Sequence, residues 1–430
     1  MATGESHKGE RVRRIISHFR KAASHPLAKG SAIVFAGTMV ANAGAYLYHL
    51  VVGRILGPAQ YGELAALLSL SYILNVPSIV LQTVVTRFVA EHAAKKSYGD
   101  IRALVLRLTA FLLVAGALCL LGLIFAAPYI ASFLHIKDTL VIFFLVTGIV
   151  VSMVGIVFSS VLQGTQRFTA SVVITNMNSL LRLAAGAIAA WYGVAATLGA
   201  NMAAAVVGTL MTLWIIRLVI RNTEKAKMTS LKPLFRSSVT TFLAILGISI
   251  LNSQDVVVVK HFLPALQSGW YGALATMGKI IFFACYSFMF VLLPIVSDRS
   301  ARGAKSGRLV YVSVAVVAVL SAGITLGFFL LPKLALGLLY GSAFIAAAPY
   351  LGLFGLFSSL YTISYTIVIA LLGLGKFSVW MILIAAAIIQ DVLLSYFHAG
   401  ISSVIWVNIM VTATLVVALL LYYRHAVKEH

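Results

Sequence analysis

Long apolar stretches recur along nearly the whole chain and constrain its fold more than any other feature. A stretch of about 20 apolar residues crosses a bilayer as a helix. Only 10% of the residues are charged and 61% are hydrophobic, whereas roughly a quarter of a typical soluble protein is charged. The sequence therefore predicts an all-α polytopic membrane protein. Its 12 predicted transmembrane helices lie at 31–56, 63–86, 103–127, 139–162, 170–191, 194–216, 237–259, 270–296, 309–331, 344–372, 378–398 and 400–423.

The basic residues predict how these helices cross the membrane. The chain has 32 Lys and Arg against 11 Asp and Glu, a net charge of +21. With a cytoplasmic N-terminus, 26 of the basic residues fall in inside segments and 4 in outside segments. The positive-inside rule then places both termini in the cytoplasm and the chain in the cytoplasmic (inner) cell membrane. Because these charges lie in short loops without interleaved aromatic residues, we expect no nucleic-acid partner.

The segments outside the predicted helices are short. Residues 1–30 are basic with apolar residues at helical spacing, which is typical either of an amphipathic helix on the anionic leaflet or of a tail that only sets topology. Residues 218–236 are a basic cytoplasmic linker, and 424–430 a cytoplasmic tail. No connection is long enough for a catalytic domain or carries a phosphate-binding loop, so we do not expect an enzyme. Cys119 and Cys285 lie within spans, and we expect no metal site or cofactor.

The two halves of the chain share short motifs at a nearly constant offset. Tyr61-Gly62 opens the second predicted helix and Tyr271-Gly272 opens the eighth, 210 residues later. Gly-x-x-basic-Phe follows the fourth and tenth helices at 164–168 and 373–377, an offset of 209. The repeat predicts an N-lobe at 31–217 and a C-lobe at 237–423, two pseudo-symmetric six-helix lobes around a central cavity.

The residues around the first of these motifs resemble a known family. Gly53-Arg54-Ile55-Leu56-Gly57-Pro58-Ala59-Gln60-Tyr61-Gly62 is similar to the opening of the polysaccharide-transporter family. Leu162-Gln163-Gly164-Thr165-Gln166-Arg167-Phe168 and the Asp255 helix are similar to later stretches of it. These proteins are oligosaccharide-lipid flippases of the multidrug/oligosaccharidyl-lipid/polysaccharide superfamily. The resemblance implies a cationic cavity, alternating access and a polyprenyl-pyrophosphate-linked glycan as substrate.

Charged residues inside predicted spans are candidates for function because a charge in hydrocarbon is costly. Arg182 lies near the middle of the fifth span, and Asn178 is one turn earlier. Arg182 is either a cavity cation that binds an anionic substrate or half of a fixed ion pair with Asp391, its counterpart in the repeat. A bend in the second span is allowed by Pro77.

A second group of candidates lies toward the outer side. Asp255 and Lys279 are on consecutive helices and either pair with each other or act separately. In the second case Asp255, one turn from Asn252, is a proton or sodium site and Lys279 a substrate contact. Arg54 and Lys260 occupy equivalent outer positions of the two lobes, either as a cationic exit or as snorkelling anchors.

These observations favour one function over two alternatives. The leading hypothesis is a flippase that moves a polyprenyl-linked glycan from the cytoplasmic to the outer leaflet for cell-surface polysaccharide biosynthesis. A proton- or sodium-coupled multidrug antiporter is the alternative within the superfamily, and an integral-membrane glycosyl- or acyltransferase the alternative from another class. Besides the glycan and membrane lipids, the candidate partners are a polysaccharide polymerase and a chain-length regulator.

Overall fold

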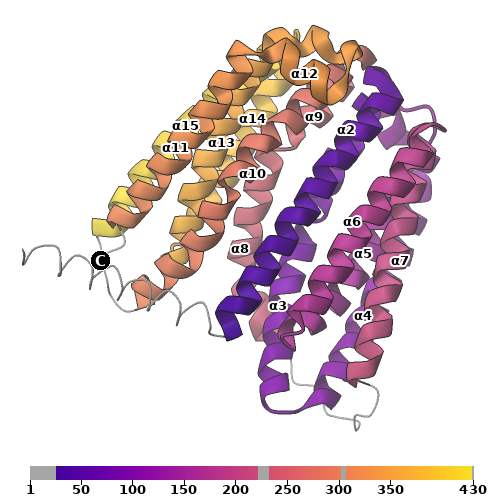
Figure 1. The fold of residues 1–430 in the computed structure, drawn as a ribbon, viewed down its shortest axis with the longest axis vertical. Coiled ribbons are helices and arrows are strands. Elements are labelled where there is room, and N and C mark those ends of the chain that lie inside the picture. The colour runs from indigo at the N-terminus through magenta and orange to yellow at the C-terminus, as the bar shows by residue number, and fades with distance from the viewer. Residues whose placement is uncertain (1–25, 221–231, 302–306, 429–430) are drawn as a thin grey trace, which may run out of the picture.

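The computed structural model describes residues 26–220, 232–301 and 307–428, and these residues fold as helices joined by short turns (Figure 1). The predicted all-α membrane fold is confirmed, and no strand occurs within the described ranges. The basic stripe of the N-terminal segment and most of the 218–236 linker lie outside them. The helices are α2 Pro26–Leu74, α3 Val76–Ala94, α4 Tyr98–Phe133, α5 Leu140–Gly164, α6 Phe168–Ala190, α7 Val194–Ile220, α8 Lys232–Leu251, α9 Gln254–Phe262, α10 Ala265–Ala301, α11 Gly307–Leu330, α12 Pro332–Tyr340, η1 Ser342–Ala347, α13 Ala348–Gly373, α14 Val379–Tyr396 and α15 Ile401–Lys428.

The predicted spans map onto these helices, with differences in how they are divided. Ten stretches of the described chain are long and apolar enough to cross a membrane. One of them, Val34–Ala94, contains both of the first two predicted spans, and α10, which holds the eighth, is not among the ten. The number 12 therefore stays a prediction. The sequence did not predict α12, which occupies the connection between the ninth and tenth predicted spans, or η1, which overlaps the first four residues of the tenth predicted span.

Two local breaks shape the long N-terminal helix pair. Gly57 has φ +70° inside α2, and the following Pro58 disfavours helical geometry at that position, so the chain turns there. The second break separates α2 from α3 at Asn75, two residues before Pro77. Pro77 has no amide hydrogen to continue the helix. The Ser71 carbonyl oxygen accepts both the backbone amide of Asn75 at 2.9 Å and its side-chain amide at 3.0 Å, which holds Asn75 at the end of α2.

The helices form two bundles that follow one another in sequence. In Figure 1, α2 to α7 occupy the right of the view, and α10 to α15 the left. Within the first bundle α5 packs on α7 and α2 on α6; within the second, α13 packs on α10, α11 and α15, and α14 packs on α8. This arrangement agrees with the two-lobe prediction, and we refer to α2–α7 as the N-lobe and α8–α15 as the C-lobe.

The lobes meet mainly along α2 and α10. Glycines permit the close approach, because a Cβ at Gly62 would overlap Ser268 and a Cβ at Gly269 would overlap the backbone of Pro58. In Figure 1 the lobes converge at the upper end and diverge toward the lower end. The contact between α2 and α10 therefore closes the molecule at one end.

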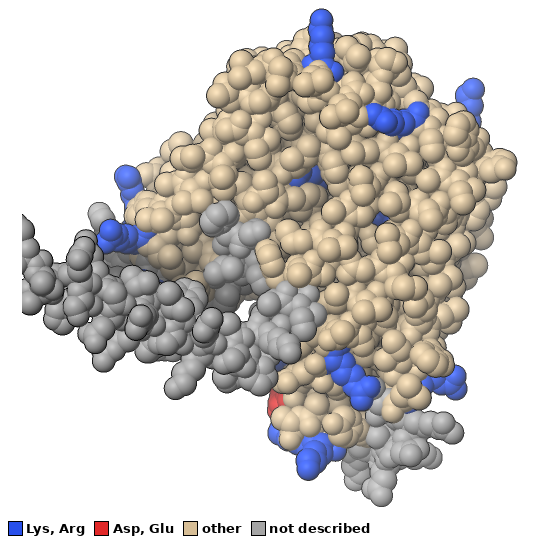
Figure 2. Space-filling model, viewed as in Figure 1, with Lys and Arg blue, Asp and Glu red and all other residues tan. Residues whose placement is uncertain are grey.

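The surface has a broad uncharged belt. Figure 2 shows Lys and Arg mostly at the two ends of the molecule, while the middle of this face is almost entirely uncharged. Large apolar side chains are exposed on the N-lobe helices, such as Phe125 at 77% and Trp214 at 68%. Only contact with lipid makes such a surface favourable, so the chain is a multi-pass membrane protein.

Candidate functional site

The helix α6 carries a polar stripe within an otherwise apolar span. Ser171, Thr175, Asn178 and Arg182 follow one another at intervals of three or four residues, so they share one face of the helix. That face points into the N-lobe, because all four residues line cavities there. The structure therefore places Asn178 and Arg182 on one face of α6, as predicted.

Arg182 is held by neutral groups. Its guanidinium carbon lies 4.5 Å from the centre of the Tyr48 ring, and its Nε donates to Asn201 Oδ1 at 3.3 Å. Asn201 in turn donates to the Tyr48 hydroxyl at 2.7 Å. The alternative of an ion pair with Asp391 is wrong: Asp391 is exposed, and among the described residues Arg182 has no carboxylate partner.

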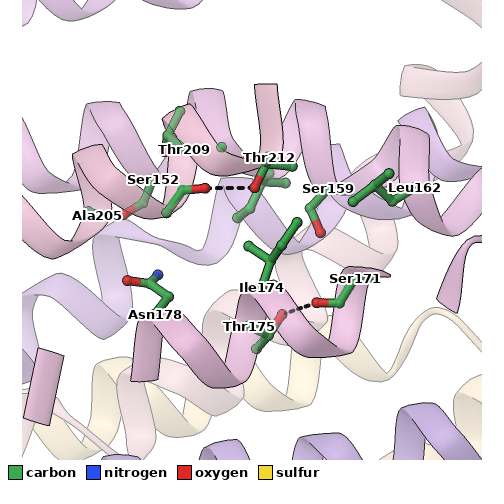
Figure 3. A pocket seen from close by; sticks show the side chains of 13 residues that line it. Ser152, Ser159, Leu162, Ser171, Ile174, Thr175, Asn178, Ala205, Thr209 and Thr212 are labelled. Carbon is green, nitrogen blue, oxygen red and sulfur yellow. Dashed lines mark hydrogen bonds between the residues drawn. The ribbon is translucent and has the colours of Figure 1, made fainter. Parts of the chain in front are cut away.

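The Arg182 cavity continues into a second one. The first has a volume of about 170 Å³ and is lined by Ser71, Asn75, Arg182 and Asn201, among others. The second, of about 200 Å³, shares Ser152, Asn178 and Ala205 with it. Figure 3 shows this second space between α5, α6 and α7, with hydroxyl groups from all three helices around it. Together they form a polar interior within the N-lobe that ends at a cation.

Lys279 on α10 occupies a comparable position in the C-lobe. Its Nζ lies 4.3 Å from the centre of the Tyr72 ring on α2. It lines a cavity of about 260 Å³ together with Asn252 and Tyr361. The predicted pair of Lys279 with Asp255 does not form, and within the described residues Lys279 makes no ion pair.

The end of α2 separates the two cationic cavities. Ser71 lines the Arg182 cavity, whereas the next residue, Tyr72, lines the Lys279 cavity. Consecutive residues of a helix point in different directions, so the two cavities lie on different faces of α2. Both cavities adjoin the α2–α3 break, since Asn75 lines one and Ile79 the other.

Asp255 belongs to a separate, fully buried network in the C-lobe. Its Oδ2 accepts hydrogen bonds from the Tyr271 hydroxyl at 2.5 Å and from Asn408 Nδ2 at 3.0 Å. Its Oδ1 accepts the amide hydrogen of Val256 at 2.9 Å. Asn408 also accepts from Gln390 at 2.6 Å. The carboxylate is therefore surrounded by neutral donors and, in the described chain, has no cationic partner.

The Arg182 and Asp255 clusters each include an asparagine of the last helix of their lobe. Asn201 and Asn408 are each the eighth residue of the last helix of their lobe, α7 and α15. Asn201 contacts Arg182 on α6, whereas Asn408 contacts Gln390 on α14 and Asp255 on α9. An asparagine near the start of the last helix thus adjoins a cation in the N-lobe and an anion in the C-lobe.

The two outer basic candidates have ordinary contacts. Arg54 is exposed and donates to the carbonyl oxygen of Leu338 on α12. Lys260 is buried on α9. Neither lines the cavities of Arg182 or Lys279.

A hydrogen-bonded cluster at the lobe contact was not predicted. The Tyr61 hydroxyl lies 3.1 Å from His49 Nδ1, 2.9 Å from Thr276 Oγ1 and 3.0 Å from the Tyr340 hydroxyl. These four side chains are buried and join α2 to α10 and α12. We call them the Tyr61 seal. The Tyr-Gly motif pointed to Tyr61, but its partner Tyr340 lies in a connection that carries no such signal.

No group of His, Cys, Asp and Glu within the described ranges has the arrangement of a metal site. The polar features of the molecule are hydrogen-bonding groups and isolated charges.

Comparisons with known proteins identify the fold. The family model described as polysaccharide biosynthesis protein matches residues 27–300. The solved structure of the lipid II flippase MurJ in an inward closed conformation is similar, with a TM-score of 0.72 at 12% identity over 92% of this chain and 87% of that chain. An inward-facing multidrug resistance MATE family transporter of the MOP superfamily has a TM-score of 0.69 at 13% identity, covering 89% of this chain and 94% of that one.

A third similar structure is a MOP superfamily transporter from Pyrococcus furiosus Vc1, whose description reports a binding pocket of reverse polarity. Its TM-score is 0.58 at 15% identity, over 93% of this chain and 96% of that chain. A comparison with curated proteins found no match. At these identities the structural likenesses establish the fold.

Proposed function

The chain belongs to the polysaccharide biosynthesis protein family, and we propose that it is a flippase for a polyprenyl-pyrophosphate-linked oligosaccharide. It moves this lipid from the cytoplasmic to the outer leaflet by alternating access, and it is not an enzyme. Both termini lie in the cytoplasm, as the distribution of basic residues indicates.

The observation that carries this proposal is the pair of cations in membrane-embedded cavities. Arg182 and Lys279 line cavities on different faces of α2, and within the described residues neither has a carboxylate partner. A charge in hydrocarbon costs at least about 2.5–3.5 kcal/mol. An anionic ligand offsets that cost, and a pyrophosphate offers two adjacent phosphate groups. Arg182 suits one of them because its planar fork binds phosphate oxygens in pairs.

The polar interior of the N-lobe supports a glycan next to the pyrophosphate. Hydroxyl and amide groups such as Ser152, Thr175 and Asn178 surround the cavity that adjoins Arg182. Neutral hydroxyls exchange hydrogen bonds with sugar hydroxyls in place of water. The polyprenyl tail stays in the bilayer while the headgroup passes between the lobes.

The Tyr61 seal supports alternating access. Its hydrogen bonds join α2 of the N-lobe to α10 and α12 of the C-lobe. They break when the lobes separate at that end and reform when they close. Closure at one end and separation at the other give the headgroup access to one leaflet at a time.

Asp255 is the proposed coupling site. It is an isolated buried acid with neutral partners, Tyr271 and Asn408. A proton or a sodium ion would supply the missing positive charge, and the binding of either couples transport to an ion gradient. Asn252 lies three residues earlier, in the turn between α8 and α9, and lines the Lys279 cavity instead.

The multidrug antiporter hypothesis is less well supported. Cationic drugs require an acidic cavity, whereas the charged residue in the N-lobe cavity is Arg182. The transferase hypothesis lacks a catalytic pair in either cavity. Arg54 and Lys260 stand at the outer side as candidate exit contacts.

The test is leaflet-resolved accumulation of lipid-linked glycan in cells that carry defined variants. Arg182→Gln is expected to leave the glycan on the cytoplasmic leaflet at normal protein abundance. Lys333→Gln is the matched control, since Lys333 is exposed on α12 and lines neither cavity. Normal glycan export by Arg182→Gln would contradict the proposal, and lost resistance to cationic drugs instead would favour the antiporter.

A further inference from the structure

A large groove lies on the membrane-facing side of the N-lobe between α4 and α7. Both helices pack on α5 and touch each other little, so a space of about 890 Å³ opens between them. This volume is in the range of about 300–1,000 Å³ that is usual for small-molecule sites. Among the residues that line it are Arg102, Leu106, Thr109, Trp214 and Arg217.

The groove is apolar along its walls and basic at one end. Leu106 and Trp214 are 58% and 68% exposed on it. Arg102 lies in the second turn of α4, and Arg217 lies in the last turn of α7. The four successive helices α4 to α7 cross the membrane four times, so α7 ends on the side where α4 begins. Both arginines are therefore at the same end of the groove. The proposed topology makes that end cytoplasmic.

One polar atom inside the groove lacks a partner. Thr109 Oγ1 is buried and makes no hydrogen bond, and the residue lies two turns from Arg102 along the wall. A buried hydroxyl without a partner is unfavourable. A ligand with an oxygen at that depth, such as the ester oxygen of a lipid, would satisfy it.

We infer that this groove is a binding site for an anionic phospholipid of the cytoplasmic leaflet. The acyl chains lie along the apolar walls, and the phosphate meets the guanidinium groups of Arg102 and Arg217. Basic pockets between transmembrane helices at the cytoplasmic side bind anionic headgroups in this way. A zwitterionic phospholipid is expected to bind more weakly there, since the two arginines repel its positively charged group.

The site is separate from the proposed substrate cavities but shares helices with them. One face of α7 carries Trp214 and Arg217 at the groove, whereas Asn201 and Thr209 on the same helix line the polar interior. A lipid that fills the groove therefore braces α4 against α7. Binding to the folded state raises thermal stability by mass action.

The test uses the purified full chain in detergent and measures its thermal stability and its lipid adducts by native mass spectrometry. Phosphatidylglycerol and phosphatidylcholine with the same acyl chains are compared. The wild type is expected to prefer phosphatidylglycerol. The double variant Arg102→Gln/Arg217→Gln is expected to bind phosphatidylglycerol about 30-fold more weakly, because each arginine contributes separately to the attraction of an anionic headgroup.

Arg107→Gln is the matched control, because Arg107 is an exposed arginine of the same helix that does not line the groove. It should retain the preference. Arg217→Gln alone keeps the test decisive if the double variant is unstable, and it should weaken binding several-fold. Trp214→Ala should weaken both lipids alike, because it removes wall contact and no charge.

Other outcomes would overturn the inference. Equal binding of the two phospholipids to the wild type, or unchanged preference in the double variant, would remove the role of the arginines. Stabilisation by glycerol phosphate alone would show a phosphate site without a lipid. Preferential binding of a polyprenyl phosphate would assign the groove to the substrate tail instead.

Discussion

At the residue scale, each lobe places an asparagine of its last helix beside a charge, positive in the N-lobe and negative in the C-lobe. Asn201 holds Arg182 against Tyr48, and Asn408 holds Asp255 with Tyr271. Neither charge is neutralised by a partner of opposite sign within the described chain. The proposed roles follow from this: an anion binds in the N-lobe, and a proton or sodium ion binds in the C-lobe.

The geometry of Arg182 predicts that its charge alone is insufficient. Arg182→Lys keeps the charge but loses the planar stacking on Tyr48 and the bond from Nε to Asn201. We expect a loss of transport of about tenfold, roughly 1.4 kcal/mol, measured as the rate of glycan export at equal abundance. Export equal to that of the wild type would show that any cation suffices.

The contacts of Asp255 predict that its effect on protein stability can be separated from its effect on ion-coupled transport. Asp255→Ala removes the acceptor for Tyr271 and Asn408 and is expected to destabilise the protein by roughly 1–3 kcal/mol, since both donors lose a buried partner. Asp255→Asn preserves the shape and one acceptor and should fold with a smaller loss. Thermal unfolding of the two variants measures the difference.

The same Asp255→Asn variant should transport without dependence on a proton or sodium gradient, because its amide does not titrate and binds cations weakly. Uptake into vesicles with and without each gradient is the measurement. If this variant keeps the ion dependence of the wild type, Asp255 is a structural residue.

At the element scale, the break between α2 and α3 lies beside both cationic cavities. Asn75 lines the Arg182 cavity and Ile79 the Lys279 cavity, while Pro77 prevents a continuous helix. A break at this place lets α2 move with the lobe contact while α3 stays packed on α5. The element therefore supplies a hinge rather than a ligand.

Removing the proline should stiffen that hinge. Pro77→Ala restores an amide hydrogen and so lets α2 and α3 join into one helix, although proline itself is tolerated in the first turn of α3 where it stands. We expect slower export at equal protein abundance. Pro128→Ala is the control, because Pro128 lies inside α4 and lines none of the three cavities near Arg182 and Lys279 or the groove between α4 and α7. Faster or unchanged export by Pro77→Ala would contradict the hinge.

At the scale of the whole molecule, the lobes meet mainly along one helix of each, α2 and α10. Besides the Tyr61 seal, His261 of the C-lobe stacks on Phe133 of the N-lobe, with ring centres 4.0 Å apart. Such an interface allows rocking, which the proposed alternating access requires.

Cross-linking the lobes at this end should stop transport. The variant Phe133→Cys/His261→Cys, made with Cys119 and Cys285 replaced by Ala, is treated with a short bifunctional thiol reagent. Export should fall to background after cross-linking and stay normal in either single-cysteine variant. Undiminished export from cross-linked protein would exclude opening at this end.

The sequence determined the class of fold, because apolar length and the lack of charge admit only membrane-spanning helices. It also identified Arg182, Lys279 and Asp255 as functional candidates, because a charged side chain inside the membrane is energetically unfavourable. Their partners were decided by the tertiary structure: the expected ion pairs with Asp391 and between Asp255 and Lys279 are absent in the described chain, and Tyr48, Tyr72 and Asn408 stand there instead. Hydropathy and repeat offsets fix which helix a residue is on and its approximate depth. The rotation of that helix and its lateral neighbours depend on packing between distant segments, as in the Tyr61 seal, where residues 279 positions apart in the chain meet.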